Sequence, residues 1–392
     1  MTFGELGPSI GGLLLHQLFK ANFDCPTEIQ SQAVPVALAG HDLIGLAKTG
    51  SGKTLAYVLP LIVHALDQNT IRQAEGPIAL ILSPTRELAQ QIASEVRRFG
   101  KTSSLKVSVI IGGESKFLQF KDLRDGCAEV VVTTPGRFID LLRMKACSLQ
   151  RVTYCVIDEA DRMLDMGFEP QVRTILMRIR PDRQLLLFSA TFSPSIDRLA
   201  RSFLSESFVK VIVGDVGSAN DDVTQHFHVF HHKREKWEWL IGVLPDLMQK
   251  GAVVIFSSTK ATCAELANDL RLAGHPTISI HGETDQRDRE GMTRMFKSGE
   301  LNLMVATDIF ARGLDVKRIR SVISYDPPRS LDWYIHRIGR TGRGGTQGES
   351  HCLLTERDIW FAKELTRSMT KAGKVIPKEL QGLANVKNRR SR

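Results

Sequence analysis

The stretch Ala47-Lys48-Thr49-Gly50-Ser51-Gly52-Lys53-Thr54 decides how the first part of the chain folds. It follows the apolar run 42–46 and precedes the apolar run 55–59, which predicts a buried strand, a glycine-rich turn and the start of a helix. Such a turn points backbone N–H groups and the positive helix end at one place, which suits a polyphosphate. In this pattern Lys53 reaches the outer phosphates, and the Thr54 hydroxyl holds Mg²⁺. The alternative is a strand-to-helix turn that binds no ligand.

The length and composition predict a globular protein of two domains. A chain of 392 residues is too long for one ordinary hydrophobic core. Its hydrophobic content of 42% and charged content of 24% exclude a disordered chain. The net charge of +9 makes a polyanionic partner plausible without proving one. The densest basic run, 387–392, is interpreted as a solvated tail or, alternatively, a phosphate or targeting patch.

The cysteines and the apolar stretches bear on the cellular environment. The six cysteines form no C-x-x-C pair and have no regular spacing, so we expect a reducing compartment and no structural zinc. No apolar stretch approaches the ~20 residues of a membrane span, and the first residues lack the pattern of a secretion signal. No membrane partner is therefore expected.

Short apolar runs without polar alternation recur along the chain and predict α/β domains. In the first half they alternate with helical patterns such as 87–99 and 136–144, as in a parallel sheet covered on both faces. The second half repeats this layout. The aperiodic stretch 214–222 is the predicted join, giving domains at 1–217 and 222–380 and a basic tail at 381–392. The expected strands are 78–82, 107–111, 130–133, 154–157, 185–188, 209–213, 253–256, 277–280, 303–306 and 321–325.

A cluster of carboxylates, Asp158-Glu159-Ala160-Asp161, directly follows the expected strand 154–157. Ligands of open parallel sheets bind at the carboxyl ends of the strands. Beside a phosphate-binding turn, one carboxylate there can hold Mg²⁺ and a second can orient the attacking water. Taken alone, the tetrad would be a solvated turn or a helix start.

These motifs and their order resemble the DEAD-box ATP-dependent RNA helicases over about residues 3–343. The resemblance implies two tandem RecA-like domains, each a mainly parallel sheet flanked by helices, that bind ATP, Mg²⁺ and RNA as a monomer. Phe23 would stack on adenine and the Gln30 amide would pair with it. The phosphates would bind to Ala47, Lys48, Thr49, Gly50, Ser51, Gly52, Lys53 and Thr54. Lys53, Asp158 and Glu159 would be catalytic, with Thr54 and Asp158 holding the metal.

The same resemblance implies RNA contacts that ignore base identity and a coupling element. Glycines and helix starts that offer N–H groups suit phosphates. The implied RNA-binding residues are Pro84, Thr85, Arg86, Gly113, Pro135, Gly136 and Arg137 in the first domain, and Thr259, Gln286, Arg289, Thr307 and Gly313 in the second. Ser189 and Thr191, with Asp161, would link hydrolysis to strand separation.

The strongest signal of the second half is the stretch 334–343, in which Arg337, Arg340 and Arg343 are interleaved with glycines. The resemblance makes Arg340 and Arg343 arginine fingers for the γ-phosphate, and His336 a relay of domain closure. An arginine supplied in this way contributes about 10³–10⁵ in rate. Asp315 would lie near the ribose. Phe310 is bulkier than the residue usual at its position.

The expected function is local unwinding of short RNA duplexes or remodelling of RNA–protein complexes, driven by ATP. The alternative is an ATP-gated RNA clamp that assembles complexes without unwinding; a DNA translocase is disfavoured. The segments 164–168 and 214–225 resemble a nuclear, splicing-associated branch of the family. A nuclear location and spliceosomal or other RNP protein partners are expectations on that ground.

Four histidines, His226, His228, His231 and His232, stand close together at the start of the second half. The segment 224–230 alternates as an edge strand would, and no acidic residue or cysteine stands at a suggestive spacing. The histidines are therefore predicted to belong to an edge strand and not to a metal site. Trp237 and Trp239 are predicted to pack and not to stack on bases.

Overall fold

The computed structural model describes residues 2–73, 75–214, 222–308, 316, 318–342 and 346–386. The chain divides into two compact units, Met1–Val216 and Gly217–Arg392.

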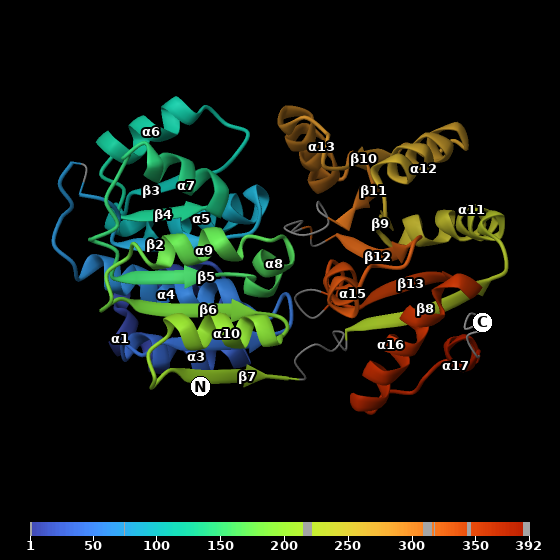
Figure 1. Ribbon diagram of the computed structural model, residues 1–392, viewed down its shortest axis with the longest axis horizontal. Helices are drawn as coiled ribbons and strands as arrows, with labels where there is room; N and C mark the ends of the chain where they lie inside the picture. The colour runs from blue at the N-terminus through green and yellow to red at the C-terminus, as the bar shows by residue number, and fades with distance from the viewer. Residues whose placement is uncertain are drawn as a thin grey trace. The chain divides into compact units, whose positions relative to one another are not determined.

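The first unit is built on a seven-stranded sheet with the order β3-β4-β2-β5-β6-β1-β7, in which all paired strands are parallel (Figure 1). Its strands are β1 (Leu43–Ala47), β2 (Ala79–Leu82), β3 (Val107–Ile110), β4 (Val130–Thr133), β5 (Tyr154–Ile157), β6 (Gln184–Ser189) and β7 (Val209–Val213). Its helices are α1 (Phe3–Ile10), α2 (Gly12–Lys20), α3 (Glu28–Leu38), α4 (Lys53–Leu66), α5 (Arg86–Gly100), α6 (Lys116–Asp125), α7 (Pro135–Arg143), α8 (Ala160–Asp165), α9 (Glu169–Leu176) and α10 (Pro194–Phe203).

Helices cover both faces of this sheet, which explains the uninterrupted apolar strands. Residues of α1–α5 form one core with one face, and residues of α6–α10 form a second core with the other. Every residue of β1, β2, β4 and β5 is buried. Because a strand buried on both faces has no solvent side, its sequence shows no polar alternation.

The second unit has a six-stranded sheet with the order β10-β11-β9-β12-β13-β8, again with parallel pairs (Figure 1). Residues of α11 and α12 share a core with one face; α13, α15, α16 and α17 pack on the other. The strands are β8 (Val223–Phe230), β9 (Ala252–Ser257), β10 (Ile278–Ile280), β11 (Leu303–Thr307), β12 (Ile319–Ser324) and β13 (Gly348–Thr355). The helices are α11 (Lys233–Lys250), α12 (Lys260–Leu272), α13 (Gln286–Ser298), α15 (Leu331–Ile338), α16 (Ile359–Lys371) and α17 (Lys378–Asn385).

The predicted fold class, two mainly parallel α/β domains, is confirmed, and all ten expected strands are present within one or two residues at each end. Strand β13 was not predicted, because Glu349, Ser350 and His351 interrupt its apolar pattern. Helix α17 crosses the predicted boundary at 380 and extends to Asn385, since Leu383 and Ala384 bury their side chains in the core. Residues 215–221 of the predicted join and 387–392 of the predicted tail lie outside the described residues.

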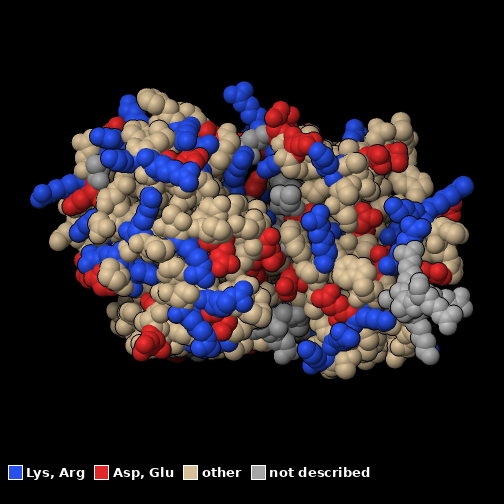
Figure 2. All heavy atoms as spheres, viewed as in Figure 1, with Lys and Arg blue, Asp and Glu red and all other residues tan. Residues whose placement is uncertain are grey.

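Lys and Arg side chains are scattered over the visible face of each unit, interspersed with Asp and Glu (Figure 2). The positive net charge is therefore not gathered into one patch on this face. Among the described residues, no helix is both long and apolar enough to cross a lipid bilayer.

Candidate nucleotide and RNA site

The glycine-rich turn adopts the backbone that its sequence predicts. Gly50 and Gly52 have φ values of 82° and 92°, in the left-handed region that favours glycine. A Cβ atom on Gly52 would lie 2.4 Å from Nε2 of Gln30, so a larger residue would also displace this amide. Directly after the turn, α4 begins at Lys53. The predicted strand–turn–helix unit is thus present, and no side chain of the N-cap residue Gly52 caps the helix.

Lys53 is held inside the turn. Its ammonium group donates hydrogen bonds to the carbonyl oxygens of Ala47, at 2.6 Å, and Lys48, at 2.9 Å. Its side chain is only 9% exposed. The turn therefore places a cation at its centre, where the outer phosphates are predicted to bind.

The two residues predicted to bind adenine lie at the start of α3 and just before it. Gln30 accepts a hydrogen bond from the Thr27 N–H at 2.9 Å and donates one to the carbonyl oxygen of Gly52 at 3.0 Å. The amide thus caps α3 and braces the glycine-rich turn, so pairing with adenine requires it to exchange these bonds. The Phe23 ring packs 6.2 Å from that of Phe99, centroid to centroid.

Asp158 emerges from the carboxyl end of β5 beside the glycine-rich turn. The Tyr57 hydroxyl, on α4, donates a 2.8 Å hydrogen bond to Asp158 Oδ2 and also interacts with the Thr54 side chain. Burial, reinforced by the charge of Glu159, raises the pKa of Asp158 to about 6. The side chains of Thr54 and Asp158 thus both interact with the Tyr57 hydroxyl. Both offer oxygen atoms, which are the ligands that Mg²⁺ prefers.

Glu159 occupies a strained position between β5 and α8. Its φ of 47° lies in the left-handed region, which costs a residue other than glycine about 1 kcal/mol or more. Its Oε2 accepts a 3.0 Å hydrogen bond from Arg162, whose guanidinium is fully buried. Arg162 thus fixes the orientation of the Glu159 carboxylate. The sequence analysis did not single out Arg162; its i+3 spacing from Glu159 was the available signal.

Asp161 joins the acidic tetrad to the end of the neighbouring strand. Its Oδ2 accepts hydrogen bonds from the Ala190 and Thr191 N–H groups, at 3.1 and 3.0 Å, and from the Thr191 hydroxyl at 3.2 Å. The Ser189 hydroxyl donates to the Thr191 carbonyl oxygen at 2.7 Å. The structure therefore brings together the three residues that sequence analysis grouped as a coupling element.

We expect Asp158→Asn to stabilise the first unit at pH 7.5 and not at pH 4. A pKa of about 6 in the folded state, against 3.8 for an ordinary Asp, favours the protonated form of the folded protein. Protonated Asp158 therefore adds to the free energy of unfolding below pH 4, and this contribution is lost as the pH rises through 6. The difference between the two pKa values corresponds to at most about 3 kcal/mol of unfolding free energy. Hydrogen exchange of β5 amides, without Mg²⁺ or nucleotide, measures it; equal protection of both proteins at pH 7.5 would contradict the prediction.

The RNA-binding candidates of the first unit converge at the carboxyl ends of β2, β3 and β4. Thr85 caps α5 and Pro135 opens α7, so both helix N-termini begin at this edge. Arg137 donates hydrogen bonds to the Glu114 carbonyl oxygen and to Gln119, at 3.0 and 2.9 Å. The Arg86 guanidinium lies about 3.0 Å from where a Cβ of Gly112 would stand. Pro84, Gly113 and Gly136 lie in the same three connections.

The predicted RNA-binding residues of the second unit that the structure describes also lie at or beyond the carboxyl ends of its strands. Thr259 caps α12 after β9, accepting a 3.1 Å hydrogen bond from the Thr262 N–H. Thr307 ends β11 and is buried. Arg289 donates to the carbonyl oxygens of His281 and Thr284, both at 3.3 Å. Gln286 is the first residue of α13. The predicted RNA contact Gly313 lies outside the described residues.

The arginines of 334–343 differ in their surroundings. Arg337 forms a two-pronged ion pair with Asp308, at 2.5 and 2.8 Å, and donates to the Asp326 carbonyl oxygen at 2.6 Å. Arg340 Nε donates to the carbonyl oxygen of His336 at 3.1 Å. His336 and Arg340 are both 2% exposed. The predicted site residues Asp315 and Arg343, like Phe310, lie outside the described residues.

Arg337→Ala is expected to destabilise the second unit by about 3–5 kcal/mol, because it leaves the Asp308 carboxylate without its buried partner. Urea unfolding of the full chain measures this loss. All four tryptophans, at positions 237, 239, 333 and 360, lie in the second unit, so their fluorescence reports its unfolding. Arg337→Leu combined with Asp308→Leu should recover much of the loss. An unchanged midpoint for Arg337→Ala would show that the pair stabilises nothing.

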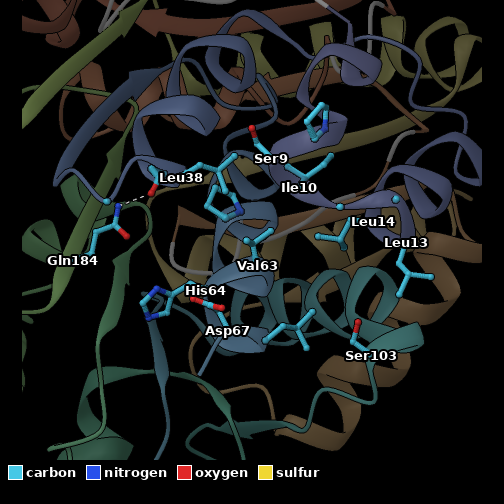
Figure 3. A pocket seen from close by; sticks show the side chains of 17 residues that line it. Ser9, Ile10, Leu13, Leu14, Leu38, Val63, His64, Asp67, Ser103 and Gln184 are labelled. Atoms are coloured by element: carbon cyan, nitrogen blue, oxygen red, sulfur yellow. Dashed lines mark hydrogen bonds between the residues drawn. The ribbon is translucent and has the colours of Figure 1, made fainter. Parts of the chain in front are cut away.

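A cavity of about 590 Å³ lies at the other end of α4 (Figure 3). Its lining includes Ile10 and Leu14 from the first two helices and His64 and Asp67 at the end of α4. Gln184 borders it and donates a 2.8 Å hydrogen bond to the Ala37 carbonyl oxygen. The 14-residue helix α4, about 20 Å long, separates this cavity from the glycine-rich turn, so it contributes nothing to the candidate site.

The chain is similar to known proteins over almost its whole length. Residues 27–199 match the family described as DEAD/DEAH box helicase, and residues 235–345 match the Helicase conserved C-terminal domain. The chain is 48% identical to DEAD-box ATP-dependent RNA helicase 24 of Arabidopsis thaliana over 384 residues, covering 98% of this chain and 50% of that protein. The chain thus spans about half the length of this curated relative.

Two solved structures share the fold. S. cerevisiae Dbp5 bound to RNA and ADP BeF3 superposes with a TM-score of 0.85 at 28% identity, covering 97% of this chain and 99% of that one. The yeast DEAD-box splicing factor Prp28 is 31% identical, with a TM-score of 0.53, and covers 99% of this chain and 90% of that one. With the two family matches and the site geometry, these likenesses show that the chain belongs to the DEAD-box helicase family.

Proposed function

We propose that this protein hydrolyses ATP in an RNA-stimulated manner and uses the cycle to open short RNA duplexes or remodel RNA–protein complexes. One observation carries the proposal: three carboxylates on one turn reach three different partners. Asp158 bonds to Tyr57 on the phosphate-binding helix, Glu159 pairs with Arg162, and Asp161 bonds to Thr191. A turn that contacts both the nucleotide helix and the end of β6 can couple the state of a nucleotide to movement elsewhere.

The residues divide the chemistry of phosphoryl transfer. The N–H groups of the turn 47–54 and Lys53 would hold the phosphates, and Glu159 would orient the attacking water. Thr54 and Asp158 would hold Mg²⁺, which neutralises charge on the phosphates when bound. Arg340 and Arg343 of the second domain would stabilise the charge on the γ-phosphate, so hydrolysis would wait for the domains to close. The Dbp5 structure that superposes on this chain is bound to RNA and ADP BeF3, which supports this combination of ligands.

The ATPase and strand-separation assays test this function directly. ATP hydrolysis should rise with added RNA and should rise less with DNA of the same length. Single-turnover mixing with a short blunt RNA duplex should release the strands only with hydrolysable ATP. If ATP fixes the protein on RNA but releases no strand, the protein is the alternative, an ATP-gated clamp. ATPase that no RNA stimulates would refute both.

RNA binding should depend strongly on salt and little on sequence, because phosphates are the expected contacts. We expect Arg137→Gln to weaken binding to oligonucleotides of every sequence equally. The slope of log affinity against log salt should fall by about 0.7 for one lost single-strand phosphate contact. Arg201→Gln is the matched control, since Arg201 is 73% exposed on α10 and pairs with Asp197. A sequence-dependent loss would mean that Arg137 reads bases.

A nuclear location and a role in pre-mRNA splicing complete the proposal, with spliceosomal or other RNP proteins as partners and the chain itself a monomer. The resemblance of residues 164–168 to a splicing-associated branch of the family supports them, as does the likeness to Prp28, a yeast DEAD-box splicing factor. Absence of the protein from nuclei and from isolated spliceosomal particles would end this part of the proposal. Sedimentation of the purified chain tests the monomer.

A further inference from the structure

Three side chains with metal-binding atoms meet on the outer two strands of the second sheet. They are His226 of β8 and Glu349 and His351 of β13, and one ligand atom from each lies within 4.8 Å of the others. The parallel register places His226 directly opposite His351, so both point to the same face of the sheet. Although 125 positions separate these two residues in the sequence, the pairing of β8 with β13 makes them neighbours.

His351 is oriented as a metal ligand would be. Its Nδ1 is 3.2 Å from Nε2 of His228, and its Nε2 is 3.8 Å from Oε2 of Glu349. The residue is 8% exposed, and the His351 Nε2 is buried with no hydrogen-bond partner among the described residues. If the Nδ1–H donates to His228, the lone pair of Nε2 points toward Glu349. Metal-binding histidines commonly use one nitrogen for the metal and the other for such a hydrogen bond.

Glu349 can turn one oxygen to a metal while the other stays fixed. Ser321 donates a 2.9 Å hydrogen bond to Oε1, which leaves Oε2 on the side of His351. Lys250 lies 3.1 Å from both oxygens and would compete with a cation. The Lys250 side chain is 57% exposed, whereas that of Glu349 is 18% exposed, so the lysine head can move into solvent while the carboxylate stays in place. A metal can therefore displace Lys250 into solvent.

We propose that His226, Glu349 and His351 bind a divalent transition metal of the Zn²⁺ class, with a water in the fourth position. Two imidazole nitrogens and one carboxylate oxygen suit zinc better than Mg²⁺ or Ca²⁺, which prefer oxygen alone. Tetrahedral bonds of 2.0–2.2 Å place ligand atoms about 3.3–3.6 Å apart, so side-chain rotations of modest size close the site around the ion. The metal would tie the outermost strand, β8, to β13. The proposal departs from two expectations of the sequence analysis: that the cysteines indicate no structural zinc, and that the histidines of 226–232 belong to an edge strand and not to a metal site.

The test is a titration of the full chain with Co²⁺, a spectroscopic substitute for Zn²⁺, in excess Mg²⁺ and a non-chelating reductant. We expect one equivalent of Co²⁺ to produce visible d–d absorption that Zn²⁺ abolishes. The ion should also quench Trp239, whose ring centroid lies 4.4 Å from that of His228 and 5.4 Å from that of His351. Zn²⁺ should raise the melting temperature of the second unit, followed by tryptophan fluorescence.

Variants distinguish a metal bound at this site from a metal bound elsewhere on the chain. His226→Gln and His351→Gln should each weaken Co²⁺ binding at least tenfold, and His228→Gln, which removes the supporting hydrogen bond, about 10-fold or more. His231→Gln is the matched control, because His231 is 77% exposed and pairs with Glu356 outside the cluster. If His351→Gln fails to fold, His226→Gln decides the question. Equal binding by wild type and His226→Gln, or no d–d band at millimolar Co²⁺, would overturn the proposal.

Discussion

Glu159→Gln is expected to lower the RNA-stimulated ATPase rate by about 10²–10⁴-fold while ATP and RNA still bind. The change removes the negative charge that would orient the attacking water and keeps the size of the side chain. Steady-state ATPase gives the loss of kcat, and equilibrium titrations with a fluorescent ATP analogue and a labelled RNA give the two affinities. Retention of full RNA-stimulated turnover would refute the role assigned to Glu159.

The structure adds a control that this experiment needs. Arg162 is fully buried against Glu159, so the variant also removes a counter-charge from a buried guanidinium. Glu87 and Asp161 act on the same arginine, which leaves it some compensation. The melting temperature of the variant must therefore be measured beside its activity. Glu169→Gln is the matched substitution, since Glu169 pairs with Arg173 at a half-exposed position on α9, and it should leave turnover unchanged.

Arg340→Ala should produce the second large effect, a loss of about 10³–10⁵ in kcat. In the proposed mechanism its guanidinium stabilises charge that develops on the γ-phosphate, and no other group of the second domain except Arg343 is assigned that task. Single-turnover ATPase with saturating RNA measures the loss. Nucleotide affinity should change little, because the phosphate-binding turn belongs to the first unit.

Two comparisons make the Arg340 result interpretable. Arg340→Lys keeps the positive charge but lacks the planar fork, so it should recover only part of the rate. Because Arg340 is 2% exposed, its truncation also removes buried packing, so tryptophan fluorescence must show that the second unit of Arg340→Ala is folded under the assay conditions. If Arg340→Ala retains wild-type turnover with an intact fold, the arginine-finger role is wrong.

Local patterns in the sequence were sufficient for the fold class and for placing the candidate residues of the first unit at strand ends. The glycine-rich turn, the acidic tetrad and the Ser189–Thr191 segment each follow an apolar strand. Because parallel strands end at the same edge of a sheet, the sequence also indicated that they meet there. Strand β13 was not predicted because its sequence has no continuous apolar run. It is buried because it pairs with β12 on one side and β8 on the other.

Partners distant in the sequence could not be predicted in this way. The charge pair of Arg337 with Asp308 and the hydrogen bond of Tyr57 to Asp158 join residues 29 and 101 positions apart. No periodicity connects such residues, since their contact depends on how strands and helices pack. The same holds for the Gln30 amide, which the sequence associated with adenine and which in this structure also braces Gly52.

The sequence by itself determined that this protein has two parallel α/β domains, and that a glycine-rich turn and an acidic tetrad each follow a buried strand, because both follow from short-range patterns of strand, turn and helix. Only the tertiary structure decided which buried charges are neutralised and which histidines acquire a carboxylate neighbour. No acidic residue stands at a metal-ligand spacing from His226 in the sequence, and His226 gains Glu349 and His351 as neighbours only when β8 pairs with β13. Strand register, which brings distant side chains within a few ångströms, is the physical reason for the difference.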